Sequence, residues 1–301
     1  MLSLLSLEAG FLVAMYIFKA KQITPQHLLA FLVIGIIVVS RLSLGGNRGA
    51  MLMIVIMMVM AFVYSGRKLK LLHGAAFGII AILAILGGMI YGTTFRNIKG
   101  AEERTGISEQ LQTVERTLDA ITTQNSNKTL DEAFYNLGER IDGVSSVAVV
   151  VSNYERLQQF EAAYGLENNI FTELWTMFIP RFLWANKPLI YDARAYSDLY
   201  FNFNGNSYAM TPISDLLRNF GPVGVPLGLM VVGFYLRFVY ALLIEDQTVT
   251  IGRATAYYMF VGGLNYEGYY TMVILYGWRI LLIVFITFII TDFFLIRKKS
   301  L

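Results

Sequence analysis

Apolar runs of helix length fill both ends of the chain, and a long polar stretch separates them. A helix needs about 20 mostly apolar residues to cross the hydrocarbon of a bilayer. Seven runs approach that length: residues 2–18, 28–44, 50–65, 72–92, 221–242, 252–265 and 271–296. The first contains Glu8, and the sixth is short and rich in Tyr and Gly, so these two are the weakest. The pattern predicts an all-α integral membrane protein, a polytopic helical bundle with seven spans.

Residues 93–220 are too polar to enter lipid and form a predicted loop domain between the two groups of spans. Within this loop, residues 101–124 and 131–164 show helical periodicity with polar faces. From residue 170 onward the loop is aromatic and Pro-rich, and five of the six prolines lie between 180 and 226. Such prolines indicate turns and short helices packed on the membrane surface. We therefore predict three parts: N-terminal spans over 1–92, a mostly helical loop domain over 93–220, and C-terminal spans over 221–301.

Lysines and arginines in the short turns set the orientation, because cytoplasmic turns carry the excess of these residues. One arrangement puts nine of them on the same side: Lys19, Lys21, Arg67, Lys68, Lys70, Arg253, Arg297, Lys298 and Lys299. The short turns on the other side then hold only Arg41 and Arg48. The first side should be cytoplasmic, so residues 93–220 are predicted to be extracytoplasmic. That loop holds 11 Lys and Arg against 16 Asp and Glu, a net charge of −5.

The composition of the chain excludes several kinds of catalytic and metal-binding site. Charged residues make up 15% of the 301 and the mean hydropathy is +0.55, whereas about 25% of a soluble chain is charged. The absence of cysteine excludes thiol catalysis, disulfides and Cys-based metal sites. The two histidines, His27 and His73, are far apart, and no Asp-x-Asp pair occurs. We therefore expect no metal, no cofactor and no nucleic-acid partner.

Arg41 and Arg48, in "SRLSLGGNRGA", lie on the side that the basic turns avoid. They are seven residues apart and share one face if a helix continues through the glycines between them. Two interpretations stay open. They are interfacial arginines whose side chains extend to the headgroups, or they form an outward-facing anion site, because guanidinium forks match phosphate oxygens.

The stretch "FIPRFLWANKP" combines cations with aromatic residues and prolines. A helical turn after Pro180 would place Arg181, Trp184 and Lys187 at intervals of three. One interpretation is an interfacial segment whose Trp and cations anchor at the headgroups. The other is a binding site in which an aromatic ring stacks on a sugar above a phosphate. The stretch alone does not decide between them.

Four ionisable residues lie further along, near or inside the last predicted spans. Asp215 and Arg218 are three residues apart where the chain re-enters the membrane, which predicts a local ion pair. Glu267, in "LNYEGYY", is the only acid on the next outer turn. Arg279 lies inside the last predicted span, where an unpaired cation is costly, so we expect it to face the interior of the bundle.

Three sequence blocks together resemble the bacterial O-antigen polymerase (Wzy-type) and oligosaccharide repeat-unit polymerase family. They are Asn47-Arg48-Gly49 at the entry to a span, the block Ile179, Pro180, Arg181, Trp184, Lys187 and Pro188, and Asn219-Phe220-Gly221 before a Gly-rich span. The triplet 140–142, Arg-Ile-Asp, is a further similarity. The resemblance covers about residues 40–240 and rests on the order of the blocks around one large outer loop.

The resemblance implies a GT-C-like inverting glycosyltransferase of the bacterial cytoplasmic (inner) membrane. It would polymerise undecaprenyl-pyrophosphate-linked oligosaccharide repeat units without metal or cofactor. Candidate residues for binding the pyrophosphate or the sugar are Arg41, Arg48, Arg140, Arg181, Trp184, Lys187 and Arg218. Fixed cations would stabilise the departing pyrophosphate, and Asp215 or Glu267 would take the acceptor proton. The implied partners are membrane lipid and a polysaccharide co-polymerase that regulates chain length.

Two alternatives stay open. A related O-antigen ligase would pass the finished glycan to another acceptor, but such ligases use an outer-face His that this chain lacks. The chain also has fewer predicted spans than family members usually have. A non-enzymatic polysaccharide transporter or flippase would place ionisable residues near the midplane and show internal repeats, whereas the charges here gather at the outer face. The missing His and the position of the charges favour the polymerase.

Overall fold

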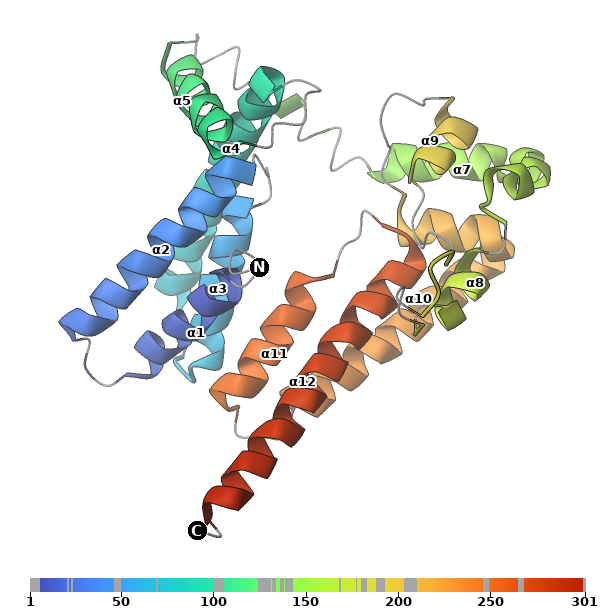
Figure 1. The fold of residues 1–301 in the computed structure, drawn as a ribbon. Helices are drawn as coiled ribbons and strands as arrows, with labels where there is room; N and C mark the ends of the chain where they lie inside the picture. Colours follow the sequence, from blue (N-terminus) through green and yellow to red (C-terminus); the bar gives the residue numbers. More distant parts are fainter. Residues whose placement is uncertain are drawn as a thin grey trace. The chain divides into compact units, whose positions relative to one another are not determined.

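The computed structural model describes most of the chain. The described residues are 6–20, 22, 24–45, 50–68, 70–99, 106–123, 131, 134–135, 138, 143–167, 169–176, 178–179, 183–187, 193–202, 210–245, 249–264 and 268–299. Every regular element among them is a helix, so the all-α prediction is confirmed for this part of the chain. Figure 1 shows these helices in chain order.

The helices fall into two compact units, each built from two separate stretches of chain. Unit 1 comprises Met1–Ile141 and Thr248–Tyr258, and unit 2 comprises Asp142–Gln247 and Met259–Leu301. The boundary between them crosses the predicted loop domain, residues 93–220. In the first half of that loop, α5 packs on α4 and α2, whereas in the second half α7 packs on α10.

Unit 1 is a group of apolar helices that ends in one amphipathic helix. Its helices are α1 (Ser6–Lys19), α2 (Pro25–Gly45), α3 (Ala50–Tyr64), α4 (Leu71–Lys99), α5 (Ile107–Thr123) and the start of α11 (Ile251–Gly262). The core lies between α1, α3 and α11, where the ring of Phe11 stacks on that of Tyr258 at 4.4 Å. The Lys19 amino group donates to the Val249 carbonyl and the Arg67 guanidinium to the Phe18 carbonyl. These two cations therefore lie at the same end of unit 1.

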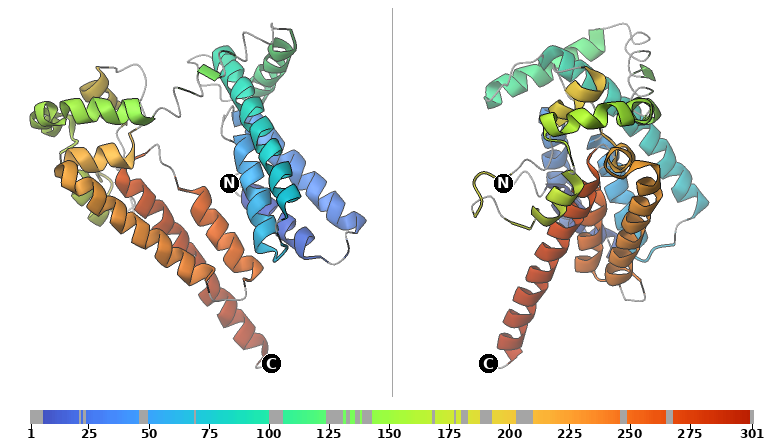
Figure 2. Two further views of the ribbon diagram at one scale, coloured as in Figure 1. Left: turned by 180° about the vertical axis from the view of Figure 1, so that it is seen from behind. Right: turned by 90° about the vertical axis from the view of Figure 1, so that its right-hand side faces the viewer.

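Unit 2 consists of two long helices and a cap of short ones. The long helices, α10 (Pro212–Leu243) and α12 (Tyr270–Lys299), lie side by side (Figures 1 and 2). The cap contains α7 (Gly143–Leu157), a 3₁₀ helix η2 (Gln158–Tyr164), α8 (Asn169–Thr176) and α9 (Ala193–Phe201). Its core joins α7 and α9 to the first turns of α10 through buried residues that include Val150, Tyr196, Met210 and Leu217.

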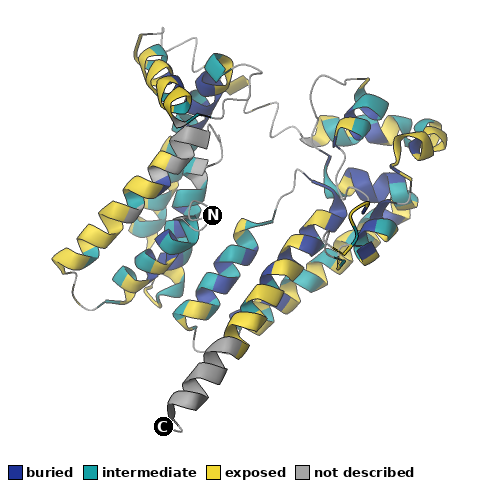
Figure 3. Cartoon of the chain, in the orientation of Figure 1, coloured by how far each residue is buried: buried dark blue, intermediate teal, exposed yellow. Residues whose placement is uncertain are grey.

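Among the described residues, three helices are long and apolar enough to cross a membrane: Leu71–Lys99, Pro212–Leu243 and Tyr270–Ile289. In the most apolar 18-residue stretch of each helix, only 17%, 11% and 22% of the residues, respectively, are buried. Most of these apolar side chains therefore lie on the outside (Figure 3). Such surfaces are stable in lipid and costly in water. Two further apolar stretches, Pro25–Val38 within α2 and Met53–Tyr64 within α3, are shorter than this over the part that the structure describes. Seven spans and the side on which the loop lies remain predictions.

Helix α10 bends sharply near its start. Pro212 is its first residue, and the Thr211 hydroxyl accepts from the Ser214 amide, which caps the helix. At Gly221 the backbone is not helical, with φ 67° and ψ −171°, and Pro222 follows directly. That positive φ favours glycine, and the missing N–H of proline suits the start of a new helical segment. The bend divides α10 into a short buried segment and a long apolar one.

Two further glycines allow the two segments of α10 to approach each other closely. A Cβ atom on Gly224 would lie 2.1 Å from the Cβ of Phe220, and one on Gly228 would lie 2.3 Å from Cδ2 of Leu216. The Gly-rich sequence after the bend therefore makes room for side chains of the segment before it. The Asn219-Phe220-Gly221 block is thus the bend itself.

We predict that Gly224→Ala destabilises the protein, because the Cβ of Phe220 lies next to the backbone and cannot rotate away from the added methyl. The expected loss is about 1–3 kcal/mol, the usual cost of overpacking. Thermal unfolding in detergent, followed by loss of the monodisperse peak, measures it. The matched control is Gly233→Ala in the same helix, where no atom lies within 4 Å of the new Cβ. Equal melting temperatures for the two variants would contradict the prediction.

Candidate functional site

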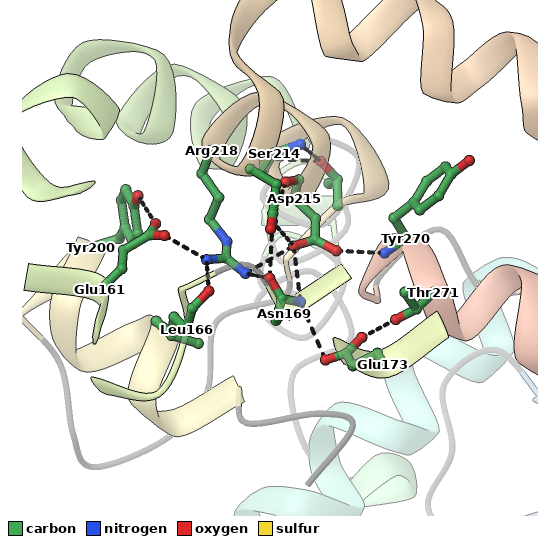
Figure 4. A network of polar contacts seen from close by, with 12 residues as sticks. Glu161, Leu166, Asn169, Glu173, Tyr200, Ser214, Asp215, Arg218, Tyr270 and Thr271 are labelled. Atoms are coloured by element: carbon green, nitrogen blue, oxygen red, sulfur yellow. Dashed lines mark hydrogen bonds and ion pairs between the residues drawn. The ribbon is translucent and has the colours of Figure 1, made fainter. Parts of the chain in front are cut away.

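A network of buried polar side chains joins the cap of unit 2 to the upper ends of α10 and α12 (Figure 4). Its centre is Arg218, on the first segment of α10, with only 1% of its surface exposed. The guanidinium pairs with two carboxylates, Asp215 at 2.9 Å and Glu161 at 3.0 Å. It also donates to the Leu166 carbonyl at 2.8 Å, and its carbon lies 5.9 Å from the centre of the Tyr269 ring. The predicted ion pair between Asp215 and Arg218 is confirmed.

Asp215 is fully buried and connects three elements. Its Oδ1 accepts from Arg218 and, on the same helix, from the Asn219 amide at 3.1 Å. Its Oδ2 accepts from the backbone N–H of Tyr270 at 2.9 Å. Tyr270 is the first residue of α12, and the first amides of a helix have no partner within it. Asp215 thus fixes the start of α12 against α10.

Asn169, the first residue of α8, adds the third element to the network. Its amide nitrogen donates to Asp215 at 3.4 Å and to Glu173 at 3.2 Å. Its Oδ1 accepts from Arg218 and, at 2.9 Å, from Asn219. Donor and acceptor sides of one amide are therefore both used, which holds α8 at a fixed position on α10.

Glu161, in η2, brings the far side of the cap to Arg218. The Tyr200 hydroxyl, on α9, donates to Glu161 Oε1 at 2.6 Å, while Glu161 Oε2 pairs with Arg218. Burial, and secondly the contact with Glu161, raise the pKa of Tyr200 above its ordinary value. The phenol stays neutral and acts as a donor. The carboxylate thus has a partner on each oxygen, as a buried charge requires.

Glu173, one turn along α8 from Asn169, is a buried carboxyl with a raised pKa. It is 5% exposed and accepts from the Thr271 hydroxyl at the start of α12. Burial raises the pKa of Glu173 to about 7, against a smaller opposing effect of the hydrogen bonds from Thr271 and Asn169. The charge of Asp215 also raises it. Glu173 therefore changes protonation near neutral pH.

Two of the sequence blocks, 179–188 and 219–221, meet on α8 although they are about forty residues apart. Phe220 packs edge-on against Phe171, at 5.2 Å between ring centres. Trp184 lies 5.8 Å from Trp175. Lys187 is buried, and its amino group donates to the Ile179 carbonyl at 3.0 Å, which closes the loop between them. One short helix thus organises both blocks.

The structure brings together four of the predicted site residues and leaves the others apart or outside its description. Asp215, Arg218, Trp184 and Lys187 all lie in unit 2 around α8. Arg41 lies on α2 in unit 1, but its side chain is not described. The remaining predicted residues, Arg48, Arg140, Arg181 and Glu267, lie outside the described residues.

The surroundings of three predicted residues change how they are interpreted. Arg218 and Asp215 have no exposed surface beyond 1%, and their charged atoms contact other protein groups. They position the helices rather than offering free groups to a ligand. For Arg279, the sequence led us to expect a side chain that faces the interior of the bundle. In the structure this side chain is exposed on α12 and makes no ion pair with a described acid.

Sequence reasoning did not single out Glu161, Asn169, Glu173, Tyr200 or Thr271. One signal for α8 was present. In "NIFTELWT" the polar residues Asn169 and Glu173 are four apart and share a helix face, while aromatic residues take another. Their partners on α10 and α12, and the partner of Glu161 on α9, come from distant parts of the chain, so no local pattern predicts them.

Neither a metal centre nor a known relative accounts for this network. Within the described part of the chain, no group of three or more His, Asp or Glu side chains is placed to hold a metal ion. Comparisons with protein-family models, curated proteins and solved structures return no match for this chain. The family resemblance therefore rests on the sequence blocks, and the function that it implies is a proposal.

We predict that Arg218→Met strongly destabilises the protein, because it leaves Glu161 and Asp215 buried without a counter-ion. Breaking a buried pair by removing one partner costs about 3–5 kcal/mol. The matched control is Arg237→Met, which removes a surface pair with Glu245 at 2.6 Å; exposed pairs contribute little. Chemical unfolding of both variants in detergent compares them. Equal loss of stability in the two variants would contradict the structural role of Arg218.

We predict that stability falls as the pH rises from about 4.5 to about 7, because the pKa of Glu173 is raised to about 7 in the folded protein. Below this window the folded and unfolded states both carry the proton. Within it the unfolded state has lost the proton first, and above it the folded state must hold a buried charge. Melting temperatures measured across this range should show the fall in the parent and a weaker one in Glu173→Gln. An identical pH profile for both proteins would contradict the assignment.

Proposed function

We propose that this chain polymerises undecaprenyl-pyrophosphate-linked oligosaccharide repeat units into a surface polysaccharide, such as O-antigen, capsule or exopolysaccharide. The observation that carries the proposal is the meeting of two resembling blocks on α8, next to the ends of two helices that can cross a membrane. A lipid-linked glycan has its pyrophosphate at the same level, where the bilayer meets water.

The proposed reaction is an inverting, metal-independent glycosyl transfer at the outer face of the bacterial cytoplasmic membrane. A hydroxyl of the acceptor repeat unit attacks the anomeric carbon of the donor, a new glycosidic bond forms, and the bond to the pyrophosphate-lipid breaks. The departing pyrophosphate carries the negative charge, which fixed cations stabilise in place of a metal. A carboxylate takes the proton of the attacking hydroxyl.

In this proposal the candidate residues have two roles, binding the pyrophosphate and binding the sugar. Arg48 and Arg181 are assigned to the pyrophosphate, with Arg41 and Arg140 as further cations of the site. Trp184 is half-buried beside Trp175 and is assigned to the sugar, because aromatic rings stack on sugar faces. Lys187 closes the loop that carries Arg181.

Arg218 and Asp215 become positioning residues in this proposal. They hold α8, α10 and α12 together below the blocks. Of the two carboxylates first considered for the acceptor proton, Glu267 is then the better candidate. Glu267 comes two residues before Tyr269, and the guanidinium of Arg218 lies over the ring of Tyr269.

We predict that Arg181→Lys lowers polymerisation by about ten- to a hundredfold, because lysine keeps the charge but loses the planar fork that binds two phosphate oxygens. Protein amount and thermal stability should not change. The measurement is the ladder of lipid-linked repeats formed by the purified protein in lipid vesicles. The matched control is Arg194→Lys, an exposed arginine on α9, which should leave the ladder intact.

The products separate this proposal from its alternatives. A normal ladder from Arg181→Lys contradicts the role of Arg181. Single transfer to a different acceptor, such as lipid A core, with no ladder, identifies a ligase. Movement of the lipid-linked glycan across the membrane without a new glycosidic bond identifies a transporter or flippase.

A further inference from the structure

Helix α8 has the reverse of the polarity that a helix on a water-exposed surface shows. Its buried face carries the polar residues Asn169, Glu173 and Thr176, which are 7%, 5% and 1% exposed, together with one buried apolar residue, Ile170. Its outer face carries Phe171 and Trp175, which are 61% and 58% exposed. A surface helix in water normally turns its apolar stripe inward and its polar residues outward. Here the polar groups are satisfied inside unit 2, and the aromatic groups face out.

The outer aromatic residues form a stripe that continues beyond the helix. Phe171 and Trp175 are four residues apart on one face of α8, and Phe178, 55% exposed, follows in the turn after the helix. We call these three residues the aromatic stripe. Large apolar side chains in one contiguous exposed row mark a contact surface rather than a surface in water.

The aromatic stripe is continuous with the outer surfaces of α10 and α12. Phe171 packs against Phe220 at the bend of α10, and Phe178 packs against Trp278 on α12, with 5.7 Å between ring centres. From Phe220 an exposed apolar row runs down α10 and comprises Val223, Leu227, Val231, Phe234 and Phe238. α10 and α12 are two of the helices that can cross a membrane, so the stripe lies at the upper edge of the surface that would contact lipid.

We propose that α8 lies in the interfacial region of the bilayer, with the aromatic stripe inserted between lipid headgroups and acyl chains. Trp and Phe with apolar bodies are favoured at this depth. Helices that lie in the interface in this manner bury an apolar face to the headgroup and acyl boundary. The inward polar face does not need water, because Arg218, Asn219 and Thr271 satisfy it.

A position of α8 in the interfacial region also determines the depth of the loop that follows it. Residues 179–187 leave the helix directly after the stripe, and the hydrogen bond from Lys187 to Ile179 returns the loop to its start. An anchored α8 therefore holds this loop at the level of the lipid headgroups. The inference about α8 itself is independent of the proposed function, because it concerns contact with bulk lipid.

Tryptophan fluorescence tests the proposal in the intact chain. The three tryptophans are Trp175, Trp184 and Trp278, so Trp184→Phe combined with Trp278→Phe leaves Trp175 as the only emitter. In lipid vesicles its emission should be blue-shifted, quenched by lipids brominated near the headgroup end of the acyl chain, and protected from iodide on both sides of the membrane.

The matched control moves the tryptophan to a polar part of the same unit. Gln158 is exposed in η2, next to Arg156 and Gln159. With all three native tryptophans replaced by Phe, Gln158→Trp should be quenched by iodide and not by brominated lipid. If Trp175 is quenched by iodide as strongly as this control, the stripe faces water and the proposal is overturned. Protection of Trp175 from both quenchers also overturns it, because protein then covers the stripe.

A second measurement leaves all three tryptophans in place. The chain contains no cysteine, so a single introduced thiol can be labelled without background. Phe171→Cys should resist a membrane-impermeant maleimide in vesicles and react after detergent solubilisation, whereas Gln158→Cys should react in both. Equal labelling of the two thiols in vesicles would overturn the proposal.

Discussion

The guanidinium of Arg218 has to be neutralised inside unit 2, and most of the cap is arranged around that requirement. A buried charge is tolerated only when it is paired and its hydrogen-bonding groups are satisfied. Asp215 supplies one partner from the same helix, while Glu161 and Asn169 supply others from η2 and α8. Because these residues come from separate elements, satisfying one side chain fixes the relative positions of several helices.

The same network determines where the long helices begin. Asp215 binds the first amide of α12, and Thr271, one residue later, binds Glu173 on α8. The bend at Gly221 then lets α10 leave this polar layer and continue as an apolar helix. A polar layer above and two apolar helices below are what a protein at a membrane surface needs, because buried polar groups in lipid must find partners within the protein.

The inverted polarity of α8 follows from these two constraints. Its polar face is used inside the network, so its aromatic face remains outside, beside the apolar surfaces of α10 and α12. Two of the three blocks that resemble the polymerase family, residues 179–188 and 219–221, contact this helix. The positions that we propose for Arg181 and Trp184 therefore depend on buried residues that never contact a substrate. Changes at Arg218 or Asp215 are expected to act through stability, and changes at Arg181 through activity.

The sequence alone was sufficient for the helical class, the apolar character of the long helices and the ion pair between Asp215 and Arg218, because each depends on residues close together in the chain. Periodicity reports which residues share a helix face, and a spacing of three brings two charges together. The predicted division at residues 92 and 220 did not anticipate that the loop splits between two units, because that split depends on apolar contacts between distant helices. Local spacing likewise could not show that Arg218 is buried, or that Glu161, Asn169 and Glu173 gather around it. Only the tertiary structure decided this, because the partners of a buried charge are chosen by which elements pack together and not by their separation along the chain.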